Sequence, residues 1–302
     1  MHHRFPAPSE GVRSVTKIRA TVLGFGAVLM WALLALFTVK TVPLPPFQLT
    51  SMAFAIGGTL GLCWIVVRGD VRSLSKVSWK VYAFGTGGVF GYHFFYFSAL
   101  RLAPAAEAGL IAYLWPLLIV LLSGLLPEER LKSGHIVGAL TGFAGAAIIV
   151  TQGGTRFEAS GALGYVLALL CAFTWSSYSV MSRRFGLTPT SSVAVFCLAT
   201  SVLSGIAHVG LETTIWPVEP TAWLAVIGLG VGPVGLAFFV WDVGVKHGDI
   251  QILGVASYAA PLLSTFVLVV AGIADMTLAL LLASVFITLG AVLAARASRS
   301  KA

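Results

Sequence analysis

Tyrosine and tryptophan side chains lie deep inside long apolar runs of this sequence rather than at the ends of those runs. Each offers a flat ring for stacking and one polar O–H or N–H group, which needs a partner when it is buried away from water. These residues either hold a ring-bearing ligand or pack as core with their polar groups bonded to neighbouring helices. With one adjacent histidine, the set is Trp31, Tyr92, His93, Tyr96, Tyr113, Trp115, Trp175, Tyr178 and Tyr258.

Helical spacing places part of this set on shared faces. Tyr92 and Tyr96 are four residues apart, and Trp175 and Tyr178 are three apart, so each pair shares one face of a helix. Trp115 lies about 200° around a helix from Tyr113, so both face one cavity only if a bend reorients them. Because the set is spread over five apolar runs, we predict that its nine members line one polar and aromatic binding cavity.

Two prolines fall inside apolar runs and predict bends in the helices that carry them. Pro116 and Pro261 each remove one backbone hydrogen bond, which frees the carbonyl of Ala112 or Ser257 four residues earlier. Such a carbonyl accepts a hydrogen bond from a ligand ammonium group or from a neighbouring serine. We therefore expect Pro116 and Pro261 to act as hinge or gating positions, with a simple kink as the alternative.

Charged residues within the apolar runs are few. Asp242 and Lys246 are four residues apart near the end of one run, a spacing that favours an ion pair on one helix face. Glu107 lies near the start of another run, where a carboxylate stabilises the helix dipole. His93 and His208 are candidates for proton transfer near neutral pH, although a hydrogen-bonded structural histidine is more common.

The sequence gives no support for an enzyme. It lacks HExxH, GxSxG, a P-loop and any pair of acidic residues at helical spacing within one apolar run. Its three cysteines, Cys63, Cys171 and Cys197, lie in apolar runs without metal-ligand spacing. We expect no catalytic residue, no metal and no cofactor.

The composition requires a membrane. Of the 302 residues, 58% are hydrophobic and only 10% are charged, and the mean hydropathy is +0.94. A soluble domain carries about 25% charged residues, so this chain cannot build a water-facing surface. Runs of about 20 apolar residues mark membrane helices. We predict an all-α integral membrane protein with ten transmembrane helices at about 20–41, 46–67, 80–101, 105–126, 133–151, 161–184, 190–211, 221–245, 250–271 and 276–295.

The net charge of +8 is best explained by topology, since the basic residues are scattered between the spans and form no patch for nucleic acid. With both termini in the cytoplasm, 16 of the 19 basic residues fall on the inner side. Only Lys40, Arg101 and Arg156 remain outside.

An internal repeat divides the chain into two halves of five spans each. Trp31 and Lys40 match Trp175 and Arg184 at an offset of 144 residues, whereas Arg101, Tyr113 and Pro116 match Lys246, Tyr258 and Pro261 at an offset of 145. Because five is odd, the second half must cross the membrane upside down relative to the first. Inverted repeats of this kind are typical of secondary transporters, whose binding site lies where the halves meet.

These residues resemble a known family. The two halves are similar to the EamA repeat of the drug/metabolite transporter superfamily, with each repeat starting at Trp31–Lys40 or Trp175–Arg184. Within it, the strings Tyr113-Leu-Trp-Pro116, Trp241–Gly248 and Ser257–Ser264 resemble the YddG-type aromatic amino-acid exporters. The predicted organisation is a cytoplasmic tail at 1–19, a first repeat at 20–151, a second repeat at 161–295 and a second tail at 296–302.

The resemblance implies export of aromatic and other neutral amino acids from the bacterial cytoplasm, by alternating access through a central cavity in the inner membrane. It implies an amino-acid substrate, a lipid environment and a functional monomer. A same-fold exporter of another small metabolite or a cationic drug is the main alternative, and a membrane-embedded enzyme is a weaker one. The scarcity of carboxylates within the spans favours facilitated or exchange transport over proton antiport.

Overall fold

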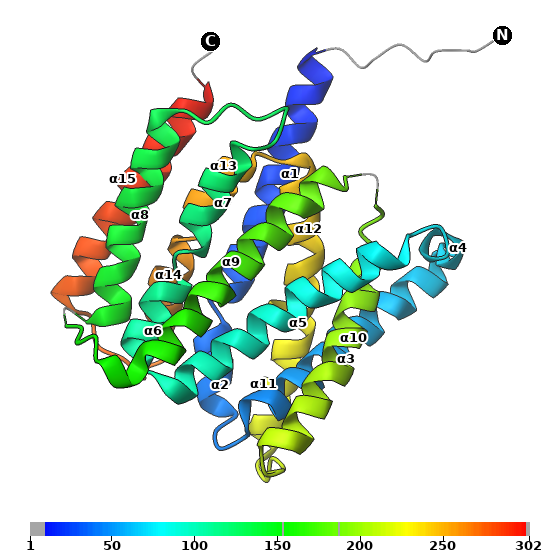
Figure 1. Cartoon of the computed structure of the whole chain (residues 1–302), viewed down its shortest axis with the longest axis vertical. Coiled ribbons are helices and arrows are strands. Elements are labelled where there is room, and N and C mark those ends of the chain that lie inside the picture. The colour runs from blue at the N-terminus through cyan, green and yellow to red at the C-terminus, as the bar shows by residue number, and fades with distance from the viewer. Residues whose placement is uncertain (1–9, 153, 187, 300–302) are drawn as a thin grey trace.

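The computed structural model describes residues 10–152, 154–186 and 188–299, and every regular element in those ranges is a helix (Figure 1). This confirms the all-α class. The elements are α1 (Glu10–Trp31), α2 (Leu34–Lys40), α3 (Pro46–Val67), α4 (Val71–Leu74), α5 (Trp79–Leu102), α6 (Ala105–Ala112), α7 (Trp115–Ser123), α8 (Ser133–Thr151), η1 (Ala159–Gly161), α9 (Ala162–Arg184), α10 (Ser192–Leu211), α11 (Pro220–Val231), η2 (Gly232–Leu236), α12 (Ala237–His247), α13 (Ile250–Ala256), α14 (Ala259–Val270) and α15 (Leu278–Arg299).

Nine helical segments in the described ranges are long and apolar enough to cross a membrane. The remaining predicted span, 80–101, forms the 24-residue helix α5. Tyrosines, a histidine and four glycines interrupt the apolar sequence of this helix. A helix of 24 residues is about 36 Å long, which exceeds the thickness of the hydrocarbon core, so ten spans stay our prediction.

Apolar side chains cover the outside of the bundle. On α10, for example, Val202, Ile206 and Val209 are 63%, 64% and 82% exposed, and they follow one another at helical spacing. Similar stripes run along α9 and α15. A contiguous apolar surface of this extent has no place in water and fits a lipid environment.

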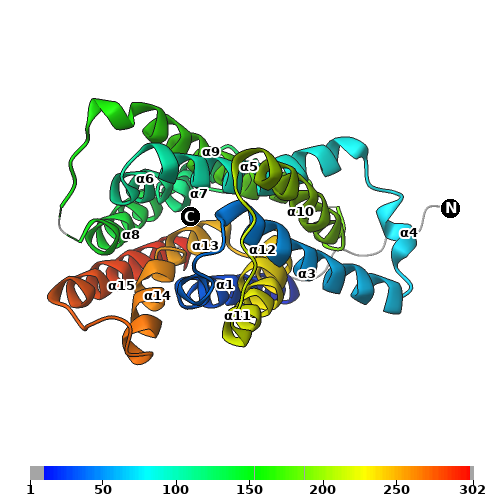
Figure 2. The ribbon, with the colours of Figure 1, turned by 90° about the horizontal axis from the view of Figure 1, so that it is seen from below.

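The helices form two rows, which Figure 2 shows from one end of the bundle. The first row holds α8, α6 with α7, α9, α5 and α10, and the second holds α15, α13 with α14, α1, α11 with α12, and α3. Contacts between elements repeat across the rows, since α5 packs against α9 as α12 packs against α1. The arrangement has the approximate twofold symmetry that an inverted repeat requires.

Two reciprocal contacts lie between the rows. Ser51 of α3 donates to the carbonyl of Ser201 on α10 at 2.9 Å, and Ser201 donates to the carbonyl of Ser51 at 2.8 Å. Gly138 of α8 and Gly290 of α15 likewise lie so close that a methyl group on either would meet the carbonyl oxygen of the other. Both contacts join a helix of the first half to a helix of the second half.

Several spans are interrupted at their middle. The helix stops after Ala112 and resumes at Trp115, and it stops after Ala256 and resumes at Ala259, so the two breaks keep the offset between the halves. Pro116 and Pro261 directly follow these breaks, as expected for residues that cannot donate a backbone hydrogen bond. The span of α11 and α12 contains the π-helical turn η2, which includes Pro233.

The start of α1 and the end of α15 lie on the same side of the molecule, together with the ends of α3, α9 and α12 (Figure 1). We call this side the terminus face, and the opposite side the far face. The predicted tails at 1–19 and 296–302 fall partly outside the described residues.

Candidate functional site

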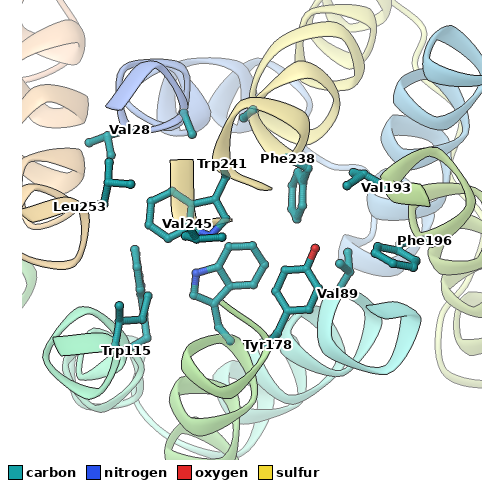
Figure 3. Packing of buried hydrophobic residues seen from close by; sticks show 14 of the residues in the cluster. Val28, Val89, Trp115, Tyr178, Val193, Phe196, Phe238, Trp241, Val245 and Leu253 are labelled. Atoms are coloured by element: carbon teal, nitrogen blue, oxygen red, sulfur yellow. The ribbon is translucent and has the colours of Figure 1, made fainter. Parts of the chain in front are cut away.

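Four tryptophans meet at the centre of the bundle, each from a different span. Trp31 ends α1, Trp115 begins α7, Trp175 lies in α9 and Trp241 lies in α12. Every pair of these rings has its centroids within 6.3 Å, the shortest separation being 5.1 Å between Trp31 and Trp241. We call this group the tryptophan cluster, and Figure 3 shows Trp115 and Trp241 with the neighbouring Tyr178, Phe238 and Val245.

Helix interruptions position two members of the cluster. Trp31 is the last residue of α1, and its indole Nε1 donates to the carbonyl of Pro233 in η2 at 3.1 Å. A π-helical turn leaves backbone carbonyls without their usual partners, so this bond satisfies one of them. Trp115 is the first residue after the break of its span. The cluster therefore lies where the broken helices of both halves come together.

Trp241 was not among the predicted binding residues. The signal was present, because the 145-residue offset that relates Arg101 to Lys246 also relates Tyr96 to Trp241 and His93 to Phe238. The aromatic stripe of α5 is thus repeated on α12. Phe238 lies 5.5 Å from Trp175 and packs at the edge of the cluster.

The predicted stripe on α5 borders the cluster. The Tyr92 ring lies 5.4 Å from Trp175 and stacks parallel to Tyr96 at 6.2 Å. His93 is directed to the other side, with its ring 5.0 Å from Phe54 and its Nδ1 2.8 Å from the carbonyl of Val89 in its own helix. Tyr92 and Tyr96 therefore extend the cluster, whereas His93 packs between α3 and α12.

Tyr258 lies apart from the tryptophan cluster, whereas Tyr113 is close enough to Tyr92 and Tyr96 to interact with them electrostatically. Both belong to a separate apolar group with Ala146 and Ile287, between the α6–α7 span and α8. The Tyr258 hydroxyl accepts a hydrogen bond from the backbone N–H of Leu117 at 3.1 Å. The helix break before Trp115 leaves that N–H without its usual acceptor, so Tyr258 stabilises the start of α7. Tyr113 thus lies between the Tyr258 group and the tyrosines of α5 that border the tryptophan cluster.

The carbonyl of Ser257 is not free for a ligand. The backbone N–H of Ala260 donates to it at 3.0 Å, because the turn tightens where Pro261 interrupts the helix. The expectation of an exposed carbonyl is therefore wrong at this position. Glu107 lies in the first turn of α6, as expected, and its carboxylate also accepts the backbone N–H of Arg156 beyond α8.

Burial changes along the axis of the bundle. Trp175, Tyr178 and Trp241 are at most 3% exposed, whereas Trp31, Tyr92, Tyr96 and Tyr113 are half-buried. Tyr178 lies one turn beyond Trp175 toward the terminus face, and the half-buried tyrosines of α5 lie toward the far face. The cluster is closed on its terminus side and less tightly packed on its far side.

Polar contacts hold the terminus face closed. The Arg183 guanidinium pairs with Glu129 and also donates to the carbonyls of Val245 and Gly248, each at 2.9 Å. Lys246 Nζ lies 2.7 Å from Asp242 Oδ2, so these two residues form the ion pair that their spacing favours. These contacts join α9, α12 and the segment after α7.

Asp249, between α12 and α13, adds a third ion pair at this face. Its carboxylate lies 3.2 Å from Lys17 Nζ and accepts the backbone N–H of Ile252. Burial alone would raise the pKa of Asp249, but Lys17 and the hydrogen bonds outweigh burial and lower this pKa. The carboxylate is therefore ionised throughout the neutral range.

Comparison with known proteins identifies the family. The EamA-like transporter family matches the chain twice, over residues 18–151 and 162–296. The chain belongs to the EamA-like transporter family. Two relatives are both described as aromatic amino acid exporter YddG. The one from Ancylobacter novellus is 52% identical over 94% of this chain and 100% of its own length, and the one from Salmonella typhimurium is 25% identical over 83% and 88%.

A solved crystal structure also matches, with a TM-score of 0.89, 53% identity, and coverage of 93% of this chain and 99% of that one. Membership of the EamA-like family makes this chain a multi-pass membrane transporter and not an enzyme. The two matched segments also agree with the two halves that the internal spacing predicted.

Proposed function

We propose that this EamA-like transporter exports aromatic amino acids and uses the tryptophan cluster with Tyr92 and Tyr96 as its central binding site. One observation carries the proposal: four indole rings from both halves of the repeat converge on one point. The name of the Ancylobacter novellus relative supports the substrate class.

The chemistry of the cluster favours a neutral or zwitterionic ligand with a ring. Aromatic rings prefer tilted and offset partners at centroid distances of about 4.5–7 Å, which is how these rings already contact one another. An ammonium group over an indole face gains about 0.5–2 kcal/mol. The ring neighbours of the cluster are Tyr92, Tyr178 and Phe238, which carry no charge. A strongly charged substrate would lack a counter-ion at this point.

The aromatic side chains toward the terminus face are more deeply buried than those toward the far face. This difference supports alternating access, in a state with the terminus face closed and the far face closer to opening. The excess of basic residues supports a cytoplasmic location for both termini in a bacterial inner membrane. Substrate would then leave from the far face toward the outside. We further propose that a single chain suffices, because the cluster is assembled entirely from its own two halves.

A flux measurement tests the proposed substrate class. Purified protein in liposomes preloaded with labelled tryptophan, phenylalanine or threonine, or with a cationic dye, should release the aromatic amino acids fastest. Release of the dye alone would favour the alternative of a drug exporter. Equal release with and without an imposed pH gradient would support facilitated or exchange transport.

Substitutions test the location of the site. We expect Trp175→Ala and Tyr92→Ala to reduce phenylalanine flux at least tenfold, because each removes a ring from the cluster or its border. Trp64→Ala is the matched control, since Trp64 is 61% exposed on the outside of α3. Unchanged flux in both cluster variants would show that substrate passes elsewhere. Tyr113→Ala is the further test of whether that half-buried tyrosine contacts substrate.

A further inference from the structure

An aromatic pocket lies between the tryptophan cluster and the terminus face. Its walls come from α5, α9, α10 and α12, and they include Phe84, Tyr178, Phe185, Phe196, Asp242 and Lys246. The ion pair of the last two residues is almost fully buried, with the Lys246 side chain 4% and the Asp242 side chain 1% exposed. The pocket thus combines two opposite charges with a lining of rings.

The buried ion pair calls for an explanation. Removing two charges from water is expensive, and well-packed apolar residues often stabilise a protein as well or better. Charges near the spans of membrane proteins commonly mark the path of a substrate. Here the pair also holds the segment between α9 and α10, because Thr190 donates to Asp242 at 2.7 Å and Lys246 donates to the carbonyl of Thr188 at 2.9 Å. A purely structural role is therefore the competing explanation.

The aromatic walls favour a ligand. Phe84 and Phe185 meet edge to face at 5.8 Å, and Tyr178 contacts both Phe84 and Phe196 with centroids 6.4 Å apart. The Tyr178 hydroxyl is buried without a hydrogen-bond partner among the described residues, and Ser182 approaches it without the geometry of a hydrogen bond. Figure 3 shows this hydroxyl pointing away from α9 into the space between Phe238 and Val89. Phe238 and Val89 do not line the pocket, so the hydroxyl faces the side of the tryptophan cluster. An unsatisfied buried hydroxyl costs about 1–3 kcal/mol, which a polar group that passes from the pocket to the cluster would offset.

The position of the pocket connects the surface with the centre. Thr188 lines both this pocket and a cleft of about 420 Å³ on the terminus face, whose other walls include Arg72, Ser73 and Lys76. On the inner side, the Tyr178 ring lies 5.3 Å from Trp175 of the tryptophan cluster. A molecule that moves from the terminus face to the cluster along this route passes the ion pair and then Tyr178.

We propose that this pocket is a loading site for a zwitterionic aromatic amino acid, in which Lys246 binds the carboxylate, Asp242 binds the ammonium group and the phenylalanine and tyrosine rings hold the side chain. The proposal rests on the proposed function and adds a second binding site to it. A zwitterion carries two neighbouring opposite charges, so it can lie antiparallel to the ion pair and keep both protein charges compensated. Neither a simple cation nor a simple anion does so.

The pocket is closed in this structure. It contains about 10 Å³ of free space, which is about the room that one water molecule needs. Loading therefore requires α5 and α9 to separate at the terminus face. Such a separation is the movement that alternating access demands when this face opens.

Three ligands distinguish substrate recognition by the ion pair from a purely structural role of that pair. Phenylalanine carries both charges, 3-phenylpropionate lacks the ammonium group and phenethylamine lacks the carboxylate. Each is applied to the terminus face of the protein in liposomes, and its inhibition of labelled phenylalanine flux is measured. Asp242→Asn should weaken inhibition by phenylalanine and by phenethylamine about tenfold and leave inhibition by 3-phenylpropionate unchanged. Lys246→Gln should weaken inhibition by phenylalanine and by 3-phenylpropionate about tenfold and leave inhibition by phenethylamine unchanged.

Controls address stability and gating. Asp249→Asn removes an ion pair of the same face that does not line the pocket, so it should shift all three inhibition constants by one common factor. The double variant Asp242→Asn with Lys246→Gln leaves no uncompensated charge, which protects folding if the single variants are unstable. In the double variant, the ratio by which phenylalanine inhibits more strongly than either single-charge analogue should fall about tenfold.

Every outcome is informative. The crossed pattern of the two single variants, or the reduced advantage in the double variant, supports the loading site. A common shift for all three ligands, or no shift, overturns the loading site and leaves the proposed function intact, with the ion pair assigned to holding the segment after α9. If the unmodified protein transports no aromatic amino acid, the proposed function fails and the loading site for this substrate class fails with it.

Discussion

Arg101 and Lys246 occupy corresponding positions in the two halves of the chain, yet their surroundings differ. Arg101, at the far face, is 39% exposed in its side chain and pairs at 2.6 Å with Glu212, whose side chain is 2% exposed. Lys246, at the terminus face, is 4% exposed and pairs with Asp242 at 2.7 Å. The same backbone arrangement therefore carries an ion pair with an exposed cation at one face and a pair with both members buried at the other. Symmetry of the repeat extends to the helices and not to the environment of their side chains.

The largest expected effect comes from these two cations. Lys246→Gln leaves Asp242 buried without a counter-charge, which should lower the free energy of unfolding by about 3–5 kcal/mol. Arg101→Gln removes a cation that is 39% exposed, and the buried Glu212 keeps the backbone N–H groups of Phe47 and Gln48 as partners, so the loss should be only about 1 kcal/mol. Thermal unfolding in detergent would measure both. Equal losses for the two variants would contradict the contrast between the faces.

A second contrast lies in the helix crossings. Gly24 and Gly244 meet where α1 crosses α12, whereas their counterparts Ala168 and Ala99, between α9 and α5, carry methyl groups. A methyl group on Gly244 would lie 2.5 Å from Gly24 Cα, and a backbone atom cannot rotate away. We expect Gly244→Ala to cost about 3 kcal/mol in the same unfolding measurement.

The control for this contrast is Gly26→Ala in α1, where an added methyl group meets nothing within 4 Å. It should leave stability unchanged or raise it slightly, since alanine favours a helix. A similar loss in both variants would point to a general effect of side chains in α1 and α12 rather than to the close crossing.

Tyr113 and Tyr258 also correspond, but only Tyr258 has its hydroxyl assigned to a backbone N–H. Tyr258→Phe leaves the buried N–H of Leu117 without an acceptor and should cost about 1–2 kcal/mol. Tyr113→Phe should cost less than about 0.5 kcal/mol. Denaturant or thermal unfolding of the two variants, measured side by side, tests this difference. A larger loss of stability for Tyr113→Phe would contradict the structural role given to the Tyr258 hydroxyl.

The smallest effect concerns Asp249, whose counterpart in the first half is Pro104. Because folding lowers the pKa of Asp249, its contribution to stability is present above the unfolded value of about 3.9 and is lost as the pH falls through the folded pKa. Lys17 is 44% exposed, so the contribution should stay below about 1 kcal/mol. Asp249→Asn should remove the part of the stability loss at low pH that comes from this carboxylate. Comparing the free energy of unfolding at pH 7 and below pH 4 in both proteins would measure it.

Much of the fold could be predicted from sequence because its signals are local. Apolar runs mark the spans, and matched spacings such as Tyr113 to Pro116 and Tyr258 to Pro261 mark the repeat. The stripe of Tyr92 and Tyr96 likewise follows from helical spacing, and the structure brings it to Trp175. Patterns that repeat every four residues need no knowledge of the rest of the chain.

The candidate site was harder to predict where partners are distant in sequence. The Tyr258 hydroxyl bonds to Leu117, 141 residues away, at an N–H that becomes available only because a different helix is broken. The indole of Trp31 finds its acceptor at Pro233 through a π-helical turn that no spacing indicated. Such contacts depend on where helices stop, and helix ends within a span leave a weak trace in sequence.

The reciprocal contacts of Ser51 with Ser201 and of Gly138 with Gly290 carry one more consequence. Each joins a helix of the first half to a helix of the second through small residues, one at each end of the paired rows. No long side chain separates the backbones at these two contacts, so the halves have little freedom to slide or separate there. Relative movement of the halves should therefore be smallest at the two ends of the rows and larger near the centre.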